Sequence, residues 1–444
     1  MAINVCANFG KNNNVNFVRK CTMSRFFYSL LLYLLLPLMP LKLLWRGIKQ
    51  PDYLKHWHER FGFYYARPNK SVIWLHCVSV GETRAAAPLV KALIQQYPHH
   101  QILLSHSTPT GRSTSEQLFA DSLQRVYLPY DVPFAVNRFL KHFNPAIGVL
   151  LETELWFNLI ATCKQRHIPL LLVNARLSEK SAYGYRKLGN LVNEGLQNLS
   201  ATAAQTTQDA QRLEMLGAKN VQVVGNLKFD VMPPETAYSK GQSLRYLFGE
   251  ERPVFLAASM REGEETLVLD AIIAAQLPRL LTVIVPRHPQ RFNEVEALLK
   301  QRGFRYEKRS TLHQIVAAET QVILGDSMGE LFNYYASADV CLVGGSLLPY
   351  GGQNLIEAMC MSKPVILGEH TFNFKEVSEL AVAKCAAWLV KDLAEMTKAI
   401  QALIESPKKQ AEMGAMGLAL CESLQGATQK TTALISEFLK PNSH

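Results

Sequence analysis

The fold is decided by residues 338–368, ADVCLVGGSLLPYGGQNLIEAMCMSKPVILG. A short apolar strand is predicted at 339–343, and two glycine pairs separate it from a helix predicted at 353–361, after which a second strand begins. This order is typical of a nucleotide-binding half-unit, because glycine lets backbone N–H groups approach a phosphate at a helix N-terminus. Glu357, one helical turn in, is placed to bind ribose hydroxyls. An ordinary β-α-β turn with glycine at its corners is the alternative interpretation.

Apolar strands alternate with helical segments on both sides of this stretch, from residue 71 onward. Near-continuous hydrophobicity is typical of parallel strands buried on both faces, so the pattern predicts doubly wound α/β sheets. Residues 231–250 are polar, contain two prolines and are interpreted as a linker. The chain is therefore expected to form two α/β domains, residues 47–230 and 251–444, which face a cleft.

Basic charge is concentrated at the N-terminal end. The formal net charge is +10, yet residues 1–70 alone hold eleven Lys and Arg against two acids. The remaining body is nearly neutral, which argues against a nucleic-acid partner and for a local anionic surface. Residues 1–22 are polar and rich in asparagine, and are interpreted as an unstructured extension or a mis-assigned start.

An apolar run without charge occupies residues 26–41 and ends at Lys42. Spanning a bilayer takes about 20 apolar residues, so this run is marginal as a span. A cleaved signal peptide needs a small-residue cleavage site, which residues 41–45 do not offer. A membrane-anchoring helix at residues 23–46, seated on an anionic membrane surface by the basic residues after it, fits best, and a single span is the alternative.

Several common classes of site are not indicated. The eight cysteines form no C-x-x-C pair, and no metal-ligand spacing appears, so neither a metal site nor a disulfide framework is predicted. Walker A and G-x-G-x-x-G sequences are absent at the expected places, which weakens ATPase and dehydrogenase interpretations. No cofactor is expected.

Polar residues follow several predicted strands, where ligands bind in such sheets. In the first half, Ser79 and Glu82 follow the first strand, Glu152 the fourth and Arg176 the fifth. Glu82 opens a helix, so capping that helix and catalysis are both open roles. In the second half the donors suited to phosphate and carboxylate oxygens are Ser259, Arg261, Arg287 and His288. Met328, Gly329 and Glu330 open a predicted helix whose N–H groups are placed to meet a base or a phosphate, and Gly344 and Gly345 form the turn after a predicted strand.

Seven ordered motifs together resemble the 3-deoxy-D-manno-octulosonic acid (Kdo) transferases of Gram-negative bacteria. They are SVGE (79–82), LLETELW (150–156), VNARLS (173–178), GNLKFD (225–230), VPRHP (285–289), GDSMGEL (325–331) and GGQNLIEAM (351–359). The resemblance runs from about Met23 to near the C-terminus. It implies a GT-B type fold of two Rossmann-like domains with an N-terminal membrane anchor, located at the cytoplasmic face of the inner membrane.

The resemblance also implies a reaction and a site. The family moves Kdo from CMP-Kdo, with inversion, to a glucosamine hydroxyl of a lipid A precursor, and the first Kdo is a further candidate acceptor. The N-terminal domain would then bind the acceptor and the C-terminal domain CMP-Kdo. Glu82 matches the general base and Glu152 a second required acid, while the CMP contacts fall on Arg287, His288, Met328, Gly329, Glu330, Asn354, Leu355, Ile356 and Glu357. Ser79, Arg176, Ser259, Arg261, Gly344 and Gly345 are further candidates for donor or acceptor contacts.

Two alternatives are kept. Another GT-B transferase or a nucleotide-sugar epimerase would bind a UDP-sugar in place of CMP-Kdo. A non-catalytic lipid carrier with a vestigial nucleotide fold is the alternative from another class, and CMP-Kdo turnover separates it from an enzyme. The number of Kdo residues added is left open by these motifs.

Overall fold

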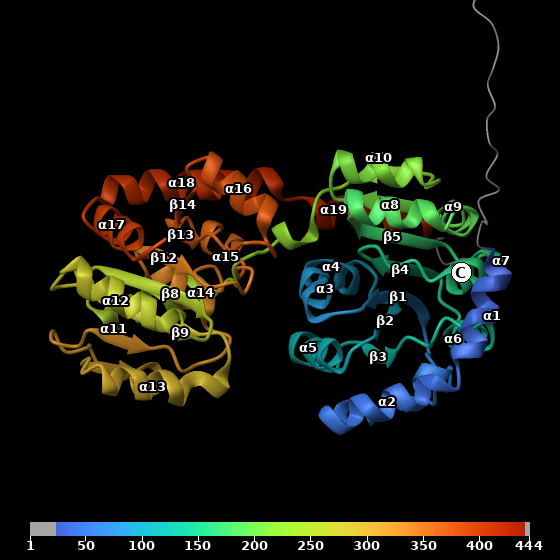
Figure 1. Cartoon of the computed structure of the whole chain (residues 1–444), viewed down its shortest axis with the longest axis horizontal. Helices are drawn as coiled ribbons and strands as arrows, with labels where there is room; N and C mark the ends of the chain where they lie inside the picture. Colours follow the sequence, from blue (N-terminus) through green and yellow to red (C-terminus); the bar gives the residue numbers. More distant parts are fainter. Residues whose placement is uncertain (1–23, 440–444) are drawn as a thin grey trace, which may run out of the picture. The chain divides into compact units, whose positions relative to one another are not determined.

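The computed structural model of this protein describes residues 24–439, so the extension interpreted at residues 1–22 lies outside the described residues. The chain divides into two compact units (Figure 1). Unit 1 runs to Val224 and takes in the chain again from Ala433, and unit 2 comprises Gly225–Thr432. The last helix therefore begins in unit 2 and ends in unit 1, whereas the sequence analysis assigned residues 251–444 to one domain.

Unit 1 is built on a seven-stranded sheet in the order β3-β2-β1-β4-β5-β6-β7, and every pairing is parallel. Helices connect successive strands, which is the doubly wound arrangement (Figure 1). The strands are β1 (Ser71–Cys77), β2 (His100–His106), β3 (Gln124–Tyr127), β4 (Ile147–Leu151), β5 (Leu170–Ala175), β6 (Ala201–Ala204) and β7 (Val221–Val223). The helices are α1 (Arg25–Leu35), α2 (Leu38–Lys49), α3 (Val80–Ala85), α4 (Ala87–Gln96), α5 (Pro109–Phe119), α6 (Pro133–Phe143), α7 (Phe157–Gln165), α8 (Glu179–Lys187), α9 (Asn190–Gln197) and α10 (Thr207–Met215).

Unit 2 repeats this plan with the strand order β10-β11-β9-β8-β12-β13-β14, again entirely parallel. Its strands are β8 (Val254–Met260), β9 (Leu281–Pro286), β10 (Tyr306–Lys308), β11 (Val322–Leu324), β12 (Val340–Val343), β13 (Val365–Gly368) and β14 (Ala387–Val390). Its helices are α11 (Ala237–Phe248), α12 (Glu264–Ala275), α13 (Phe292–Gln301), α14 (Leu331–Ser337), α15 (Ile356–Met359), α16 (Lys375–Ala383), α17 (Leu393–Ile404), α18 (Pro407–Leu424) and α19 (Ala427–Phe438), the helix shared with unit 1.

The central strands of each sheet are largely apolar because both of their faces are covered. All seven residues of β8 are buried. Val254 and Leu256 pack into one apolar cluster, and Phe255 and Ala257 pack into a second cluster on the opposite face. Successive side chains of a strand point to opposite faces, so a strand between two cores has no polar face. The predicted α/β fold with two doubly wound sheets is confirmed.

Three local predictions differ from the structure. The linker interpreted at residues 231–250 contains helix α11, whose Leu244 and Phe248 are buried, because an apolar stripe lies among the polar residues. The helix predicted at 353–361 shrinks to the single turn α15, since Gly351 and Gly352 take positive φ and the Ile356 N–H donates to the Asn354 side chain just before the helix. Strand β10 was not predicted, because its three half-buried residues, YEK, carry no apolar signal.

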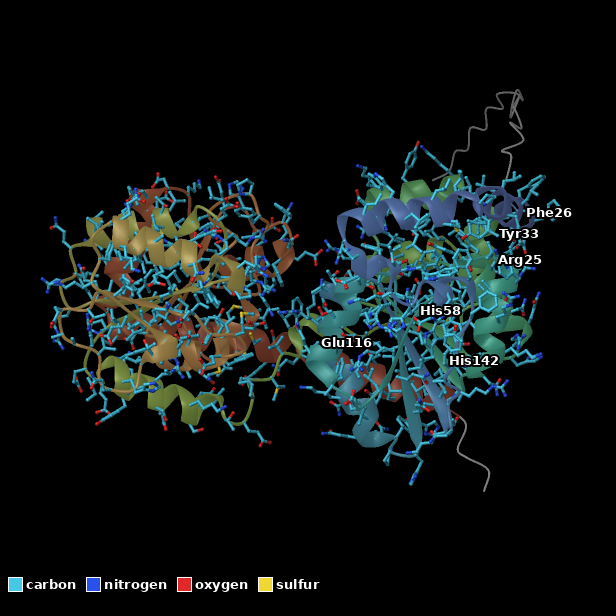
Figure 2. All side chains as sticks on the ribbon, turned by 90° about the horizontal axis from the view of Figure 1, so that it is seen from below. Arg25, Phe26, Tyr33, His58, Glu116 and His142 are labelled. Atoms are coloured by element: carbon cyan, nitrogen blue, oxygen red, sulfur yellow. The ribbon has the colours of Figure 1, made fainter. Side chains whose placement is uncertain are left out.

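The N-terminal apolar run forms two helices, α1 and α2. Within residues 24–439, no single helix is both long and apolar enough to cross a bilayer, and α1 with Leu38–Ile48 reaches that length only as a pair bent by 56°. Large apolar side chains are exposed on both helices, among them Phe26, Tyr33, Leu34, Leu41 and Ile48; Figure 2 labels the first two. This surface supports membrane association and leaves its mode open.

A substitution at Gly344 tests how tightly β12 is packed at its end. A Cβ atom at this position would lie 2.5 Å from the carbonyl oxygen of Ser259 and 2.8 Å from Cα of Met260. Both are backbone atoms and cannot swing away. We expect Gly344→Ala to lower the free energy of unfolding by about 1–3 kcal/mol, measured by urea denaturation.

Gly184→Ala is the matched control. Gly184 lies inside α8 with no atom within 4 Å of an added Cβ, so alanine there should stabilise the helix by up to about 1 kcal/mol. Equal stability of the Gly344→Ala variant and the wild type would contradict the close approach.

Candidate active site

In unit 1 the turn between β1 and α3 holds Glu82 in place. Ser79 is the N-cap of α3, and its hydroxyl oxygen accepts from the backbone N–H of Glu82 at 3.3 Å. In return, the Glu82 carboxylate accepts from the Val78 N–H at 2.7 Å and from the Ser79 hydroxyl at 2.9 Å. This reciprocal pattern is a variant of the capping box, so the capping role left open by the sequence is present.

The environment of Glu82 changes its acidity. Burial raises its pKa to about 7, the negative charges of Glu152 and Glu154 add to the increase, and the two hydrogen bonds oppose it. A carboxyl group with this pKa is a far stronger base than an ordinary glutamate and is ionised for half of the time near pH 7. The folded pKa of Glu82 is raised from 4.5, so its burial affects stability only where the carboxyl group is ionised. Below pH 4.5 the group is protonated in both states and the folded protein loses no stability, whereas above pH 7 the full penalty of burying the charge applies.

Glu152 and Glu154 lie at the neighbouring strand end, since β4 pairs with β1. Glu152 takes a positive φ of 57° and its N–H donates to the Val173 carbonyl at 2.9 Å, which fixes the turn after β4. Burial and the charge of Glu152 raise the pKa of Glu154. The exposed Arg176 follows β5, and its carbonyl accepts from the hydroxyl of Thr153. The structure thus brings the predicted acids of this unit to one sheet edge.

In unit 2 the predicted donors gather at the carboxyl ends of β8 and β9. The guanidinium of Arg261 stacks 4.5 Å from the ring centroid of Tyr350. Arg287 donates from Nε to the side-chain oxygen of Gln353 at 3.0 Å. Partial burial and three nearby arginines, Arg287 first, lower the pKa of His288. These neighbours make the edge electropositive, as an anion site requires.

The glycine loop after β12 is held by a residue that the sequence analysis did not assign, Glu264. Its carboxylate is fully buried and accepts from the N–H groups of Gly345 at 2.6 Å, Leu347 at 2.9 Å and Arg261 at 2.8 Å. A carboxylate with three short N–H bonds locks the loop backbone. A signal was available, because a Gly-Glu pair opens the first helix after the first strand in both halves, at 81–82 and 263–264.

The remaining predicted nucleotide contacts lie at two further turns. Gly329 has a φ of 79° and Met328 is 58% exposed, and Glu330 accepts from Arg309 at 3.0 Å. The Asn354 amide oxygen accepts from the Ile356 N–H at 3.1 Å, while its amide nitrogen donates to Glu357 at 3.2 Å.

The side chains of Leu355 and Ile356 are buried in the core, so only their backbone atoms can face a ligand. The single turn α15 also aligns few peptide dipoles, so its N-terminus carries less positive charge than the longer predicted helix would.

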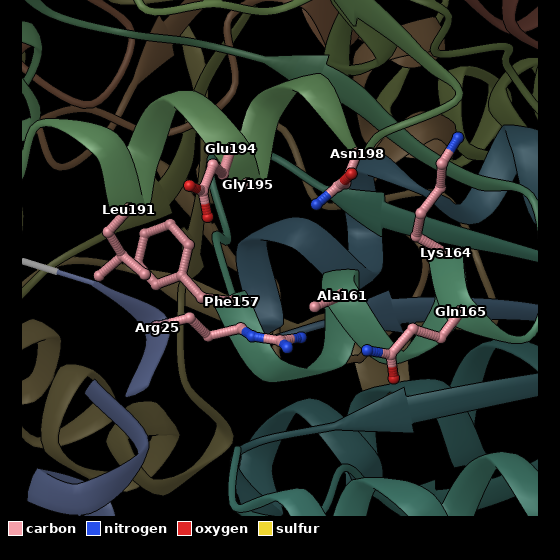
Figure 3. A pocket seen from close by; sticks show the side chains of 9 residues that line it. All are labelled: Arg25, Phe157, Ala161, Lys164, Gln165, Leu191, Glu194, Gly195 and Asn198. Carbon is pink, nitrogen blue, oxygen red and sulfur yellow. The ribbon is translucent and has the colours of Figure 1, made fainter. Parts of the chain in front are cut away.

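Two features lie outside this set. No group of three or more His, Cys, Asp or Glu side chains in the part of the chain described here is arranged to hold a metal ion. A cavity of about 270 Å³ lies beside α1, lined by Arg25, Phe157, Lys164 and Glu194 among others (Figure 3). None of the predicted site residues lines it.

A family described as 3-deoxy-D-manno-octulosonic-acid transferase (kdotransferase) matches residues 55–231. The 3-deoxy-D-manno-octulosonic acid transferase of Haemophilus influenzae is 38% identical over 95% of this chain and 100% of its own length. That of Bordetella pertussis is 40% identical over 94% of this chain and 100% of its own. A solved glycosyltransferase from Rickettsia africae has the same fold, with a TM-score of 0.55 and 14% identity over 85% of this chain and 100% of its own.

Removing Glu264 should weaken nucleotide binding. In Glu264→Ala the N–H groups of Gly345 and Leu347 lose their acceptor, so the glycine loop should move. We expect the affinity for CMP, the nucleotide implied by the resemblance, to fall by about tenfold or more, measured by titration calorimetry. Glu262→Ala, an exposed acid in the same turn, is the control and should bind normally. Unchanged affinity in a folded Glu264→Ala protein would contradict this role.

Proposed function

This chain belongs to the Kdo transferase family and is a glycosyltransferase, and we propose that it moves Kdo from CMP-Kdo to a glucosamine hydroxyl of a lipid A precursor, in lipopolysaccharide biosynthesis. The observation that carries the proposal is Glu82, a buried carboxyl group at a strand end with a pKa of about 7. An electropositive, glycine-rich strand edge on unit 2 supplies the matching donor site.

In the proposed reaction Glu82 is the general base. The acceptor hydroxyl oxygen attacks the anomeric carbon of Kdo, and Glu82 takes its proton as the new carbon–oxygen bond forms. The bond from that carbon to the phosphate oxygen breaks, and its electron pair leaves with CMP, so attack from the opposite side inverts the configuration. Glu152 acts through charge: it keeps the pKa of Glu82 raised and so keeps the base strong.

On the donor side the chemistry needs a clamp for an anionic leaving group. Arg261, Arg287 and His288 lie at the ends of β8 and β9 and supply positive charge and N–H donors. The pKa of His288 is lowered in the free protein, and the negative charge of a bound phosphate would raise it again. The positively charged imidazolium form then becomes favoured and stabilises the negative charge that develops on CMP. Glu357 is proposed to bind the ribose hydroxyls.

The acceptor is a membrane lipid, which accounts for the surface of α1 and α2. We propose that this surface seats the enzyme on the cytoplasmic face of the inner membrane. Exposed apolar side chains enter the bilayer boundary, and Lys42 and Arg46 lie among them on α2, where they can meet anionic headgroups.

Glu82→Gln should reduce kcat by about 10²–10⁴-fold, because the amide cannot accept the proton. In the wild type, kcat/KM should rise with pH through about 7 as Glu82 ionises, and this limb should vanish in the variant. The measurement is transfer of Kdo from CMP-Kdo to a lipid A precursor between pH 5.5 and 8.5.

Two controls accompany this test. Glu179→Gln, an exposed acid in the first turn of α8, should retain wild-type turnover and pH profile. CMP affinity should be unchanged in Glu82→Gln, and a wild-type circular dichroism spectrum and urea denaturation curve should show that unit 1 is folded. Near wild-type turnover in that variant would remove Glu82 as the base.

Membrane seating predicts a second outcome. Leu34 and Leu41 are 69% and 61% exposed on α1 and α2, so in the proposed membrane-bound protein they contact the bilayer boundary. The double variant Leu34→Asp/Leu41→Asp replaces these two apolar side chains by charged ones. Binding to anionic vesicles, measured by co-sedimentation, should fall by about tenfold or more. Ile273→Asp with Ile315→Asp changes two exposed residues of unit 2, which are 57% and 53% exposed, and should leave binding unchanged. Unaltered binding of the α1–α2 variant would place the membrane surface elsewhere.

A further inference from the structure

Helix α1 is attached to unit 1 by polar contacts as well as by apolar packing. The hydroxyl of Tyr28 donates to Asp131 Oδ2 at 2.9 Å, and the hydroxyl of the next residue, Ser29, donates to Asn158 Oδ1 at 2.8 Å. The ring of Tyr28 also packs edge-on against Phe157, with centroids 5.3 Å apart. A helix that served only as a tether would need none of these directional bonds.

Both partners of α1 belong to one buried polar cluster at the start of α7. Asp131 is 4% exposed, and its carboxylate accepts from the backbone N–H groups of Asn158 at 3.0 Å and Leu159 at 2.8 Å. Asn158 is 3% exposed, and its amide donates to the carbonyl of Asp131 at 2.7 Å.

Asp131 therefore acts as the cap of α7. Trp156, at the N-cap position, supplies no side-chain hydrogen bond, so the first N–H groups of the helix depend on a residue from another segment. An acidic side chain at this end also interacts favourably with the helix dipole. The start of α7 is consequently held by Asp131, and Asp131 is in turn held by Tyr28.

The acidic segment with Glu152 and Glu154 ends where α7 begins. Its first residue, Glu152, is fixed by its N–H bond to Val173 on β5. Its last residue, Trp156, precedes Phe157, the first residue of α7. Only four residues follow Glu152 before this helix, so the position of the helix start limits where the two carboxylates can lie.

We infer that Tyr28, Ser29 and Asp131 are positioning residues for the acidic loop 152–156, so that α1 is part of the acceptor-side framework as well as a membrane anchor. The catalytic consequence rests on the proposed function, in which Glu152 and Glu154 strengthen Glu82 as a base. Loss of the α1 contacts should then impair the chemical step and leave donor binding and membrane binding intact.

The test is the double variant Tyr28→Phe/Ser29→Ala in the full chain. It removes two hydroxyl groups and keeps the ring that packs on Phe157. With lipid A precursor in anionic vesicles, kcat should fall by about tenfold, while the affinity for CMP and vesicle binding stay at wild-type levels. The single variant Ser29→Thr keeps Tyr28 and a hydroxyl group at position 29, so it should retain wild-type turnover.

Tyr238→Phe, in unit 2, is the control for loss of a tyrosine hydroxyl. Tyr238 is 55% exposed, and removal of its hydroxyl should change neither kcat nor vesicle binding. Asp131→Asn provides a second route to the same effect. The Asp131 carboxylate accepts hydrogen bonds at both of its oxygens, whereas the amide of asparagine has only one oxygen that can accept. Wild-type kcat in both the double variant and Asp131→Asn would overturn the inference.

Hydrogen exchange separates this inference from the proposed function. Amides of residues 152–160 should exchange faster in the double variant than in the wild type, and amides of 344–353 should not. If the wild type fails to transfer Kdo, the proposed function fails, but faster exchange in this segment would still support the positioning role. Unchanged exchange at 152–160 would overturn it whatever the activity.

Discussion

The central strands of both parallel sheets are buried on two faces, and this constraint arranges the rest of the molecule. Strand β8, with all seven residues buried, carries a single polar side chain, Ser259, next to its carboxyl end, because a buried polar group costs free energy unless it finds a hydrogen-bond partner. Charged residues therefore collect where strands end and helices begin. In parallel sheets the carboxyl ends share one edge, so Glu82 and Glu152 become neighbours in unit 1, and Arg261 and Arg287 become neighbours in unit 2.

Three buried carboxylates, Glu82, Asp131 and Glu264, satisfy this constraint in the same way, by accepting backbone N–H groups. Burial raises the pKa of both Glu82 and Asp131 to about 7, so a raised pKa alone does not mark a catalytic acid. The difference lies in the surroundings. Asp131 is enclosed by α1 and α7, whereas Glu82 lies at a strand end and feels the charges of Glu152 and Glu154.

The sequence errors have local causes. The polar composition of 231–250 hid the apolar stripe of α11, and the three residues of β10 are too few and too polar to show a period. The helix predicted at 353–361 was overextended because apolar residues after Glu357 continue a helical pattern, although the chain ends the helix at Met359.

The amino-acid sequence by itself determined the α/β class, the glycine turns, the order of motifs that places the chain in its family, and the basic, apolar N-terminal end, because these are properties of neighbouring residues. Only the tertiary structure decided the hydrogen-bond partners that the buried carboxylates Glu264 and Asp131 find in distant segments. Gly345 and Glu264 are 81 positions apart, and Tyr28 and Asp131 are 103 apart. No periodicity connects such pairs, since a hydrogen bond depends on distance in space and burial makes it costly to leave unmade.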